Sequence, residues 1–209
     1  MIKLSKASKM KVNGKQVKSW DLEARTSCPG SKVDGEVVEV CKSCYATKGA
    51  FVWPASVALR KHNQQDYKRD GWVADMVKAI GKDKYFRFFV SGDIETELLA
   101  TKIKEVVTLC TKTQFWIPTR SYNIKGIREV LEEIKTLPNV SMKYSANSIG
   151  LSETGTSMTA FVINTDSIDE AKAKGIIVCP VTMPDSKLKS CGTCTLCFDT
   201  NKPVAYVLH

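Results

Sequence analysis

Seven of the eight cysteines in this chain fall into two clusters near its opposite ends. The clusters consist of Cys28, Cys41 and Cys44, and of Cys179, Cys191, Cys194 and Cys197. In the second cluster, a Cys-Gly-Thr-Cys-Thr-Leu-Cys run leaves two residues between neighbouring thiols. This spacing lets the backbone curl around one centre, so that several thiolates bind the same metal ion or cluster. The sequence therefore predicts metal-dependent chemistry, with all seven cysteines as candidate ligands.

The ligand type does not choose between zinc and an iron–sulfur cluster, because thiolates are soft donors that suit both. A zinc ribbon would combine Cys41 and Cys44 with two thiols of the C-terminal run. Seven thiols exceed the number that one centre needs. Either two centres exist, or one exists and the other thiols are structural or redox-active. The eighth cysteine, Cys110, ends an apolar helical face and is expected in the core.

The composition favours one domain spanning residues 1–209. The chain has 209 residues and 43% apolar side chains, enough for a single sizeable core. The N-terminus lacks the apolar stretch of a signal peptide, and no run of about 18 apolar residues is present to span a membrane. We therefore expect a cytoplasmic protein with no membrane partner. Disulfides are unusual in that compartment, which favours metal ligands or reactive thiols.

The net charge of +9 is concentrated at the N-terminus, where six lysines precede the first acidic residue, Asp21. Such a lysine-rich arm could bind nucleic acid phosphates. The alternative is a solvated hairpin whose charges protect a sheet edge from pairing. Arginine and aromatic side chains are not interleaved with these lysines, which favours the hairpin and leaves nucleic acid as a candidate partner.

The chain is expected to form a hairpin followed by alternating strands and helices. Asn13-Gly14 is a two-residue turn signal, so residues 1–20 should form a basic N-terminal hairpin. Two helices are expected within residues 54–80, with a break at Asp70-Gly71. Strands are then expected at 85–90, 114–118, 140–144, 160–163, 175–178 and 204–208, and helices at 95–109, 124–136 and 166–174. This alternation predicts an α/β fold, specifically a small or incomplete (β/α) TIM-like barrel with a cysteine-rich C-terminal segment at 175–209.

Polar residues follow several of the expected strands. Asp93 follows the strand at 85–90, Arg120 and Ser121 follow the next, and Asn147 follows the third. Because ligands bind at the carboxyl ends of parallel strands, we expect these side chains to line one pocket together with Cys179. Asp93 is explained equally well as the cap of the following helix. A metal on this face favours an iron–sulfur cluster, most simply [4Fe–4S], over a peripheral structural zinc.

Several short motifs occur in an order that resembles the phage gene-product-88-like proteins. They are Ser19-Trp20-Asp21-Leu22, Thr26-Ser-Cys28-Pro-Gly30, Cys41-Lys-Ser-Cys44-Tyr-Ala46, Ser91-Gly92-Asp93, Thr119-Arg120-Ser121, Cys179-Pro180, the run from Cys191 to Cys197, and a chain end closing on His209. The resemblance covers nearly the whole chain. It implies a bacteriophage protein, located in the host cytoplasm, that carries an iron–sulfur cluster in a βα-barrel-like domain.

A looser likeness is to radical S-adenosylmethionine enzymes, which also place a cluster at one end of an incomplete βα barrel. Their C-x-x-x-C-x-x-C loop is not matched, because twelve residues separate Cys28 from Cys41. The likeness therefore rests only on the overall architecture of the fold.

Three function classes follow from these features. The first is a redox or radical-type enzyme, which acts on an unknown small molecule or redox partner through the polar residues at the strand ends. The second is an electron carrier with a fully cysteine-ligated cluster. The third is a zinc-stabilised nucleic-acid-binding module that uses the lysine-rich arm. Histidine-dependent hydrolysis is poorly supported, because His62 and His209 are the only histidines.

Overall fold

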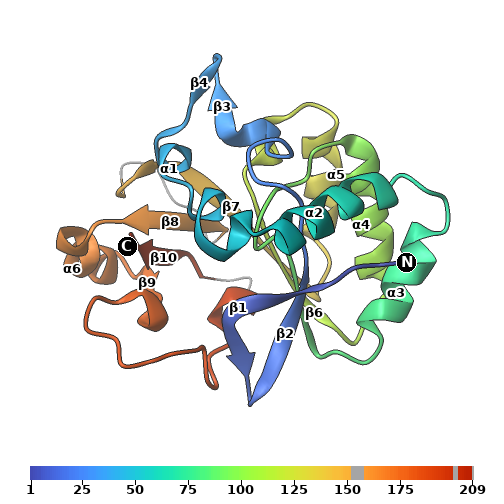
Figure 1. The fold of residues 1–209 in the computed structure, drawn as a ribbon. Helices are drawn as coiled ribbons and strands as arrows, with labels where there is room; N and C mark the ends of the chain where they lie inside the picture. Colours follow the sequence, from blue (N-terminus) through green and yellow to red (C-terminus); the bar gives the residue numbers. More distant parts are fainter. Residues whose placement is uncertain (152–157, 200–201, 209) are drawn as a thin grey trace.

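An eight-stranded sheet forms the centre of the protein in the computed structural model, which describes residues 1–151, 158–199 and 202–208 (Figure 1). Across the sheet the strands follow the order β1-β2-β5-β6-β7-β8-β10-β9. Their bounds are Ser5–Val12 (β1), Lys15–Trp20 (β2), Tyr85–Phe88 (β5), Gln114–Thr119 (β6), Val140–Ile149 (β7), Thr159–Ile163 (β8), Ile177–Val178 (β9) and Val204–Val207 (β10). A small separate hairpin pairs Lys32–Val33 (β3) with Glu36–Val37 (β4). His209 lies outside the described residues.

The expected N-terminal hairpin is confirmed. β1 and β2 pair antiparallel, and Asn13 and Gly14 at the turn adopt φ angles of 50° and 76°. Positive φ at both positions gives the turn a twist that matches the strands it joins. β2 then pairs parallel with β5, and the other neighbouring strands of the main sheet are also parallel to each other.

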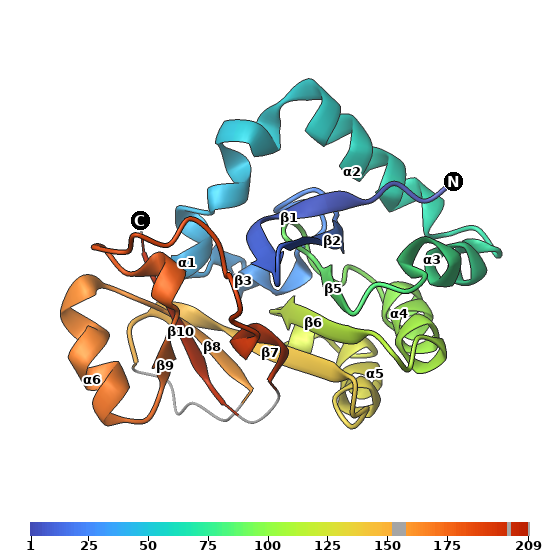
Figure 2. The same ribbon diagram turned by 90° about the horizontal axis from the view of Figure 1, so that it is seen from below.

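Helices flank this sheet. Their bounds are Glu39–Lys42 (α1), Pro54–Asp66 (α2), Trp72–Ile80 (α3), Glu97–Leu109 (α4), Ile127–Ile134 (α5) and Ile168–Ala173 (α6). The predicted break at Asp70-Gly71 is confirmed, since it falls between α2 and α3. α3, α4 and α5 lie along one face of the sheet (Figure 2), where Met76, Ile103 and Leu131 share an apolar core with the strand residues. In the described ranges, no helix has the length and apolar content needed to cross a bilayer.

The architecture is mixed α/β with a mostly parallel sheet, as expected, but the sheet does not close into a TIM barrel. Within the described residues, the edge strands β1 and β9 do not pair with each other. Closure requires tilt and stagger that match around all strands, and β9 is only two residues long. The C-terminal segment lies beside the hairpin instead (Figure 2). Cys191 N donates to Lys9 O at 3.0 Å, and Asn13 N donates to Gly192 O at 2.9 Å.

The last strand, β10, lies between β8 and β9 and pairs parallel with both. Its residues Val204, Ala205 and Val207 are buried, which is typical of a parallel strand covered on both faces. Ala205 O also accepts a hydrogen bond from Cys179 N at 2.8 Å. The chain end therefore fixes the backbone of the cysteine that follows β9.

Asp21 joins the end of β2 to its neighbours. The carboxylate is 1% exposed; its Oδ1 accepts a hydrogen bond from Val90 N at 2.6 Å, and its Oδ2 accepts one from Ser19 Oγ at 3.1 Å. Ser5 Oγ on β1 also donates to Oδ2. One buried side chain thus satisfies donors from three neighbouring strands or strand ends.

Replacing this side chain should destabilise the fold. Asp21→Ala leaves buried donors unpaired, and we expect it to lower the free energy of unfolding by about 2–4 kcal/mol. Urea denaturation followed by circular dichroism measures the loss. Asp70→Ala, at an exposed position between α2 and α3, is the control and should change stability by less than about 0.5 kcal/mol. Equal midpoints for Asp21→Ala and the wild type would contradict this role.

Candidate metal centre

Cys179, Cys191, Cys194 and Cys197, here called the C-terminal thiol group, line a single cavity of about 50 Å³. All four are free and partly buried. The rest of the lining is apolar and consists of Met10, Pro180, Val181, Leu188, Leu196, Phe198 and Val204. A cavity whose only polar donors are four thiols suits a thiolate-bound metal centre.

Short turns bring these thiols together. Cys194 N donates to Cys191 O at 2.8 Å, and Phe198 N donates to Thr195 O at 2.8 Å, so the run folds as two successive turns. Gly192 adopts φ of 59° inside the first turn, a conformation that favours glycine. The predicted curling of the backbone within this run is therefore present.

Lys143 binds the backbone of the segment that follows the run from Cys191 to Cys197. Its side chain is fully buried, and its Nζ donates to Asp199 O at 2.7 Å and to Lys202 O at 2.8 Å. Ser141 Oγ, two residues earlier on β7, donates to Asp199 O at 3.0 Å. Strand β7 thus holds the backbone on the C-terminal side of Cys197.

Burial disfavours the thiolate form of two members of this group, Cys191 and Cys197, in the absence of a cation. It raises the pKa of Cys197 to about 12 and also raises the pKa of Cys191. The charge of Cys179 adds to both shifts, whereas the Arg87 guanidinium opposes them. A metal ion reverses this balance, because it stabilises the thiolate and displaces the proton.

Two aromatic side chains and one arginine lie close to Cys197. The Tyr206 hydroxyl is 3.3 Å from Cys197 Sγ, and the Tyr206 ring stacks on Trp116 with centroids 6.5 Å apart. The Arg87 guanidinium lies 3.9 Å from the centroid of a Trp116 ring. These three residues were not predicted from the sequence. The alternation of side chains along β5 could have indicated Arg87, since it lies between buried Phe86 and Phe88 and must point to the opposite face of the sheet.

Cys28, Cys41 and Cys44, here called the N-terminal thiol group, form a second assembly. Cys41 lies in α1, while Cys28 and Cys44 each precede a 3-10 turn. Burial, followed by the charge of Asp93, raises the pKa of Cys28 to about 12, and Cys41 and Cys44 contribute to the shift. The structure therefore places the three thiols near one another and near Asp93.

Arg120 links this group to the sheet. Its Nη1 donates to Cys41 Sγ at 3.2 Å, and its Nη2 donates to Ala146 O on β7 at 2.7 Å. Burial raises the pKa of Cys41, and the Arg120 guanidinium opposes that shift. Arg120 therefore contacts a thiol of the N-terminal group, whereas Cys179, expected in the same pocket, lies in the C-terminal thiol group.

Asp93 holds the backbone that carries Arg120 and does not cap a helix. Its Oδ2 accepts from Arg120 N at 2.7 Å, and its Oδ1 accepts from Thr119 Oγ1 at 2.7 Å and from Ile94 N at 2.7 Å. Helix α4 begins later, at Glu97, and Thr96 supplies its capping side chain. Burial raises the pKa of Asp93, while the donors from Arg120 and Thr119 lower it.

Two buried polar atoms beside this contact have no hydrogen-bond partner among the described residues: Arg120 Nε and Ser121 Oγ. Ser121 is fully buried. Asn147 occupies the β7 position that follows Ala146, whose carbonyl accepts from Arg120. The structure thus gathers Asp93, Arg120 and Ser121 at the N-terminal thiol group and places Asn147 next to it along β7.

The two thiol groups have separate electrostatic neighbours. Asp93 and Arg120 affect the N-terminal group, and Arg87 affects the C-terminal group. In the described part of the chain, no set of three or more His, Cys, Asp or Glu side chains is arranged to hold a metal ion. Each group is therefore gathered, but its sulfur atoms do not converge on a single point.

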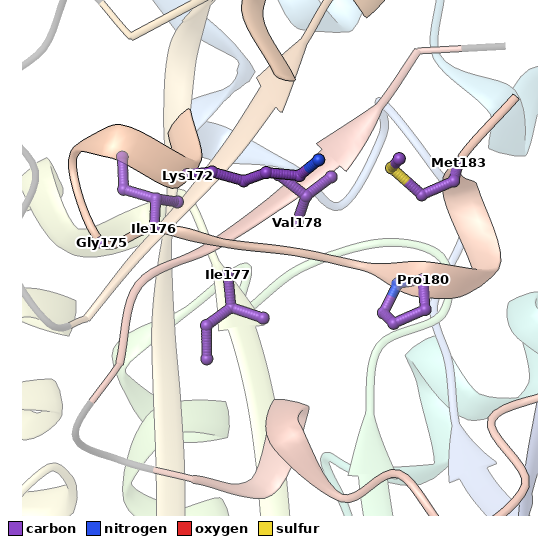
Figure 3. A pocket seen from close by; sticks show the side chains of 7 residues that line it. All are labelled: Lys172, Gly175, Ile176, Ile177, Val178, Pro180 and Met183. Atoms are coloured by element: carbon purple, nitrogen blue, oxygen red, sulfur yellow. The ribbon is translucent and has the colours of Figure 1, made fainter. Parts of the chain in front are cut away.

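An apolar groove of about 470 Å³ lies beside the edge strand β9 (Figure 3). It is lined by Lys172, Gly175, Ile176, Ile177, Val178, Pro180 and Met183. Lys172 supplies the only charged group of this lining, and Pro180 also borders the cavity of the C-terminal thiol group. The groove has no thiol or carboxyl group, so the chemistry of the protein is expected at the thiol groups.

The family model described as gene product 88 matches residues 2–200. The chain belongs to the gene product 88 family. No curated protein and no solved structure matches it. The matched region contains both thiol groups, Asp93 and Arg120, so the site lies within the part that defines family membership.

Proposed function

We propose that this member of the gene product 88 family is an iron–sulfur redox protein, and that Cys179, Cys191, Cys194 and Cys197 hold its cluster. One observation carries the proposal: these four free thiols line one cavity whose other walls are apolar. Apolar walls exclude water, which protects a cluster and tunes its reduction potential.

The arrangement of the thiols favours a cluster over zinc. A zinc ion binds its sulfurs at about 2.3 Å, so four thiols must point at one atom. In the described residues no side chains converge in that way. Four thiols that line one cavity supply the four cysteine ligands that an inorganic core takes at its corners.

A cluster in this cavity would supply one-electron chemistry, and the surrounding residues suit electron transfer. Four cysteines complete the usual ligand set of a [4Fe–4S] cluster and leave no iron open. Tyr206 offers a hydrogen bond to the sulfur of Cys197, and the positive charge of Arg87 acts on the same cysteine. Both features stabilise added negative charge on reduction.

We infer that the curved, open sheet serves as an incomplete barrel, with the C-terminal segment lying between its edges. The protein would work in the cytoplasm of a phage-infected host, where a redox partner supplies or accepts the electron. A radical-type reaction would require an open iron, which this four-cysteine centre does not offer.

Anaerobic purification tests the proposal. We expect a brown protein with absorbance near about 400 nm, stoichiometric iron and sulfide, and a paramagnetic signal on reduction. The double variant Cys194→Ser/Cys197→Ser should lose the C-terminal cluster, whereas Cys110→Ser, which changes a thiol at the end of α4, should retain full iron content. Colourless protein with stoichiometric zinc would refute the redox function.

Tyr206→Phe should shift the reduction potential of this cluster downward. The hydroxyl can donate to the Cys197 sulfur, and such a bond is stronger when reduction makes the sulfur more negative. We expect a decrease of about 50 mV, measured by redox titration with electron paramagnetic resonance. Tyr85→Phe is the control, because the Tyr85 ring packs on Phe198 at 4.8 Å. Equal potentials for Tyr206→Phe and the wild type would contradict the role of the hydroxyl.

Nucleic acid binding by the hairpin is a second candidate function. Lys9, Lys11 and Lys15 are exposed on β1 and β2, whereas Lys18 pairs with Asp83 at 2.8 Å. If the exposed lysines bind phosphates, log affinity for duplex DNA falls with log salt concentration. Changing Lys9, Lys11 and Lys15 to Gln should make the slope of that plot less steep by about three. Unchanged salt dependence would exclude this interface.

A further inference from the structure

The N-terminal thiol group has three thiols. Among the described residues, Asp93 is an acidic side chain whose charge acts on Cys28 and Cys41. Both of its carboxylate oxygens already accept hydrogen bonds from β6 and the chain beyond Asp93. Its carboxylate therefore holds Arg120 in place and is not offered to a metal.

Two arginine side chains lie at the same place. Arg120 Nη1 is 3.2 Å from Cys41 Sγ, and Arg25 Nη2 donates to the carbonyl of the adjacent Lys42 at 3.4 Å. Arg120 Nη2 is anchored on Ala146 O, which fixes the guanidinium plane. A rigid guanidinium beside a thiol is suited to a planar anion such as a carboxylate.

Two unpaired polar atoms indicate which kind of ligand would bind beside Arg120. Arg120 Nε and Ser121 Oγ are buried and have no partner among the described residues. Leaving such groups unpaired costs free energy, so a ligand that accepts their hydrogen bonds gains affinity. A carboxylate has enough lone pairs to bind a metal through one oxygen and to accept from these donors through the other.

From this geometry we propose that Cys28, Cys41 and Cys44 hold a second iron–sulfur centre with one open coordination position, and that this position takes a carboxylate-bearing small molecule paired with Arg120. The inference rests on the proposed function insofar as it takes the chain to be an iron–sulfur protein. Three cysteines leave one iron without a protein ligand, as catalytic metal sites do when they keep a position for substrate.

Iron counting on the full chain separates the two centres. Cys41→Ser/Cys44→Ser and Cys194→Ser/Cys197→Ser should each lose about half of the wild-type iron, and Cys110→Ser should lose none. If only the Cys194/Cys197 pair removes iron, the second centre is refuted while the proposed function stands. If either pair removes all iron, one shared centre exists and the inference is again refuted. Protein without iron in every variant refutes the proposed function itself.

The open position is tested with ¹³C-labelled cyanide, an anion that binds iron lacking a protein ligand. We expect a ¹³C hyperfine coupling in wild type and in Cys194→Ser/Cys197→Ser, and its displacement by acetate. Arg120→Gln should retain the iron and weaken acetate binding about tenfold or more, and Arg120→Lys should restore part of it. No coupling, or equal acetate affinity in Arg120→Gln, would overturn the inference without depending on whether the cysteine variants fold.

Discussion

Removal of the proposed cluster from the purified protein is expected to lower its melting temperature by roughly 10–20 °C, since a structural centre contributes several kcal/mol and each kcal/mol is worth about 2–4 °C at this chain length. The physical reason lies in the C-terminal segment. It is joined to the sheet by few main-chain contacts, among them Cys191 N to Lys9 O and Cys179 N to Ala205 O. A metal that joins Cys179 to Cys197 would tie β9 to the segment that lies beside the hairpin.

Differential scanning calorimetry of holo and chelator-treated protein measures this change. Cys194→Ser/Cys197→Ser should show most of this decrease before chelation, and chelation should lower its melting temperature by less than it lowers that of the wild type. Cys110→Ser should respond to chelation as the wild type does, because Cys110 lies apart from both thiol groups at the end of α4. Equal melting of holo and chelated protein would mean that the folded structure does not depend on the metal.

Local patterns were sufficient to predict most elements, because helix and turn signals depend on neighbouring residues. Asn13-Gly14 formed the expected turn, and α2 and α3 are separated at the expected break. The place of β10 could not be predicted in this way. Its insertion between β8 and β9 depends on pairing partners far away in sequence, and Val204 to Val207 carry no local signal of which strands they join.

At the candidate site, residue type was predictable and residue role was not. Asp93 and Arg120 were expected as pocket groups, yet Asp93 acts on the backbone of Arg120, and Arg120 contacts Cys41. Arg87 and Lys143 were missed, because a cation within a strand suggests a solvent-facing position. Both face the side of the sheet covered by the C-terminal segment, and no local pattern reveals that covering segment.

Gly30 lies against the backbone of Arg120 at the N-terminal thiol group. A Cβ at position 30 would lie 2.0 Å from Arg120 O, well inside van der Waals contact. The Arg120 backbone cannot yield easily, because Asp93 holds its N–H and Ser121 N donates to Thr119 Oγ1 at 3.0 Å. The close approach therefore explains why the Cys-Pro-Gly motif carries glycine within its 3-10 turn.

Gly30→Ala should lower the free energy of unfolding by about 3 kcal/mol, since the loop that carries Cys28 must move away from Arg120. Gly71→Ala is the matched control: its nearest neighbour is the flexible Arg69 side chain at 3.3 Å, and we expect a loss below about 1 kcal/mol. Denaturant titration measures both. Because Cys28 belongs to the N-terminal thiol group only, Gly30→Ala should also lose iron from the proposed centre at Cys28, Cys41 and Cys44 before it loses iron from the proposed C-terminal cluster. Loss of both centres together would mean that the two thiol groups are coupled more tightly than their separate electrostatic neighbours indicate.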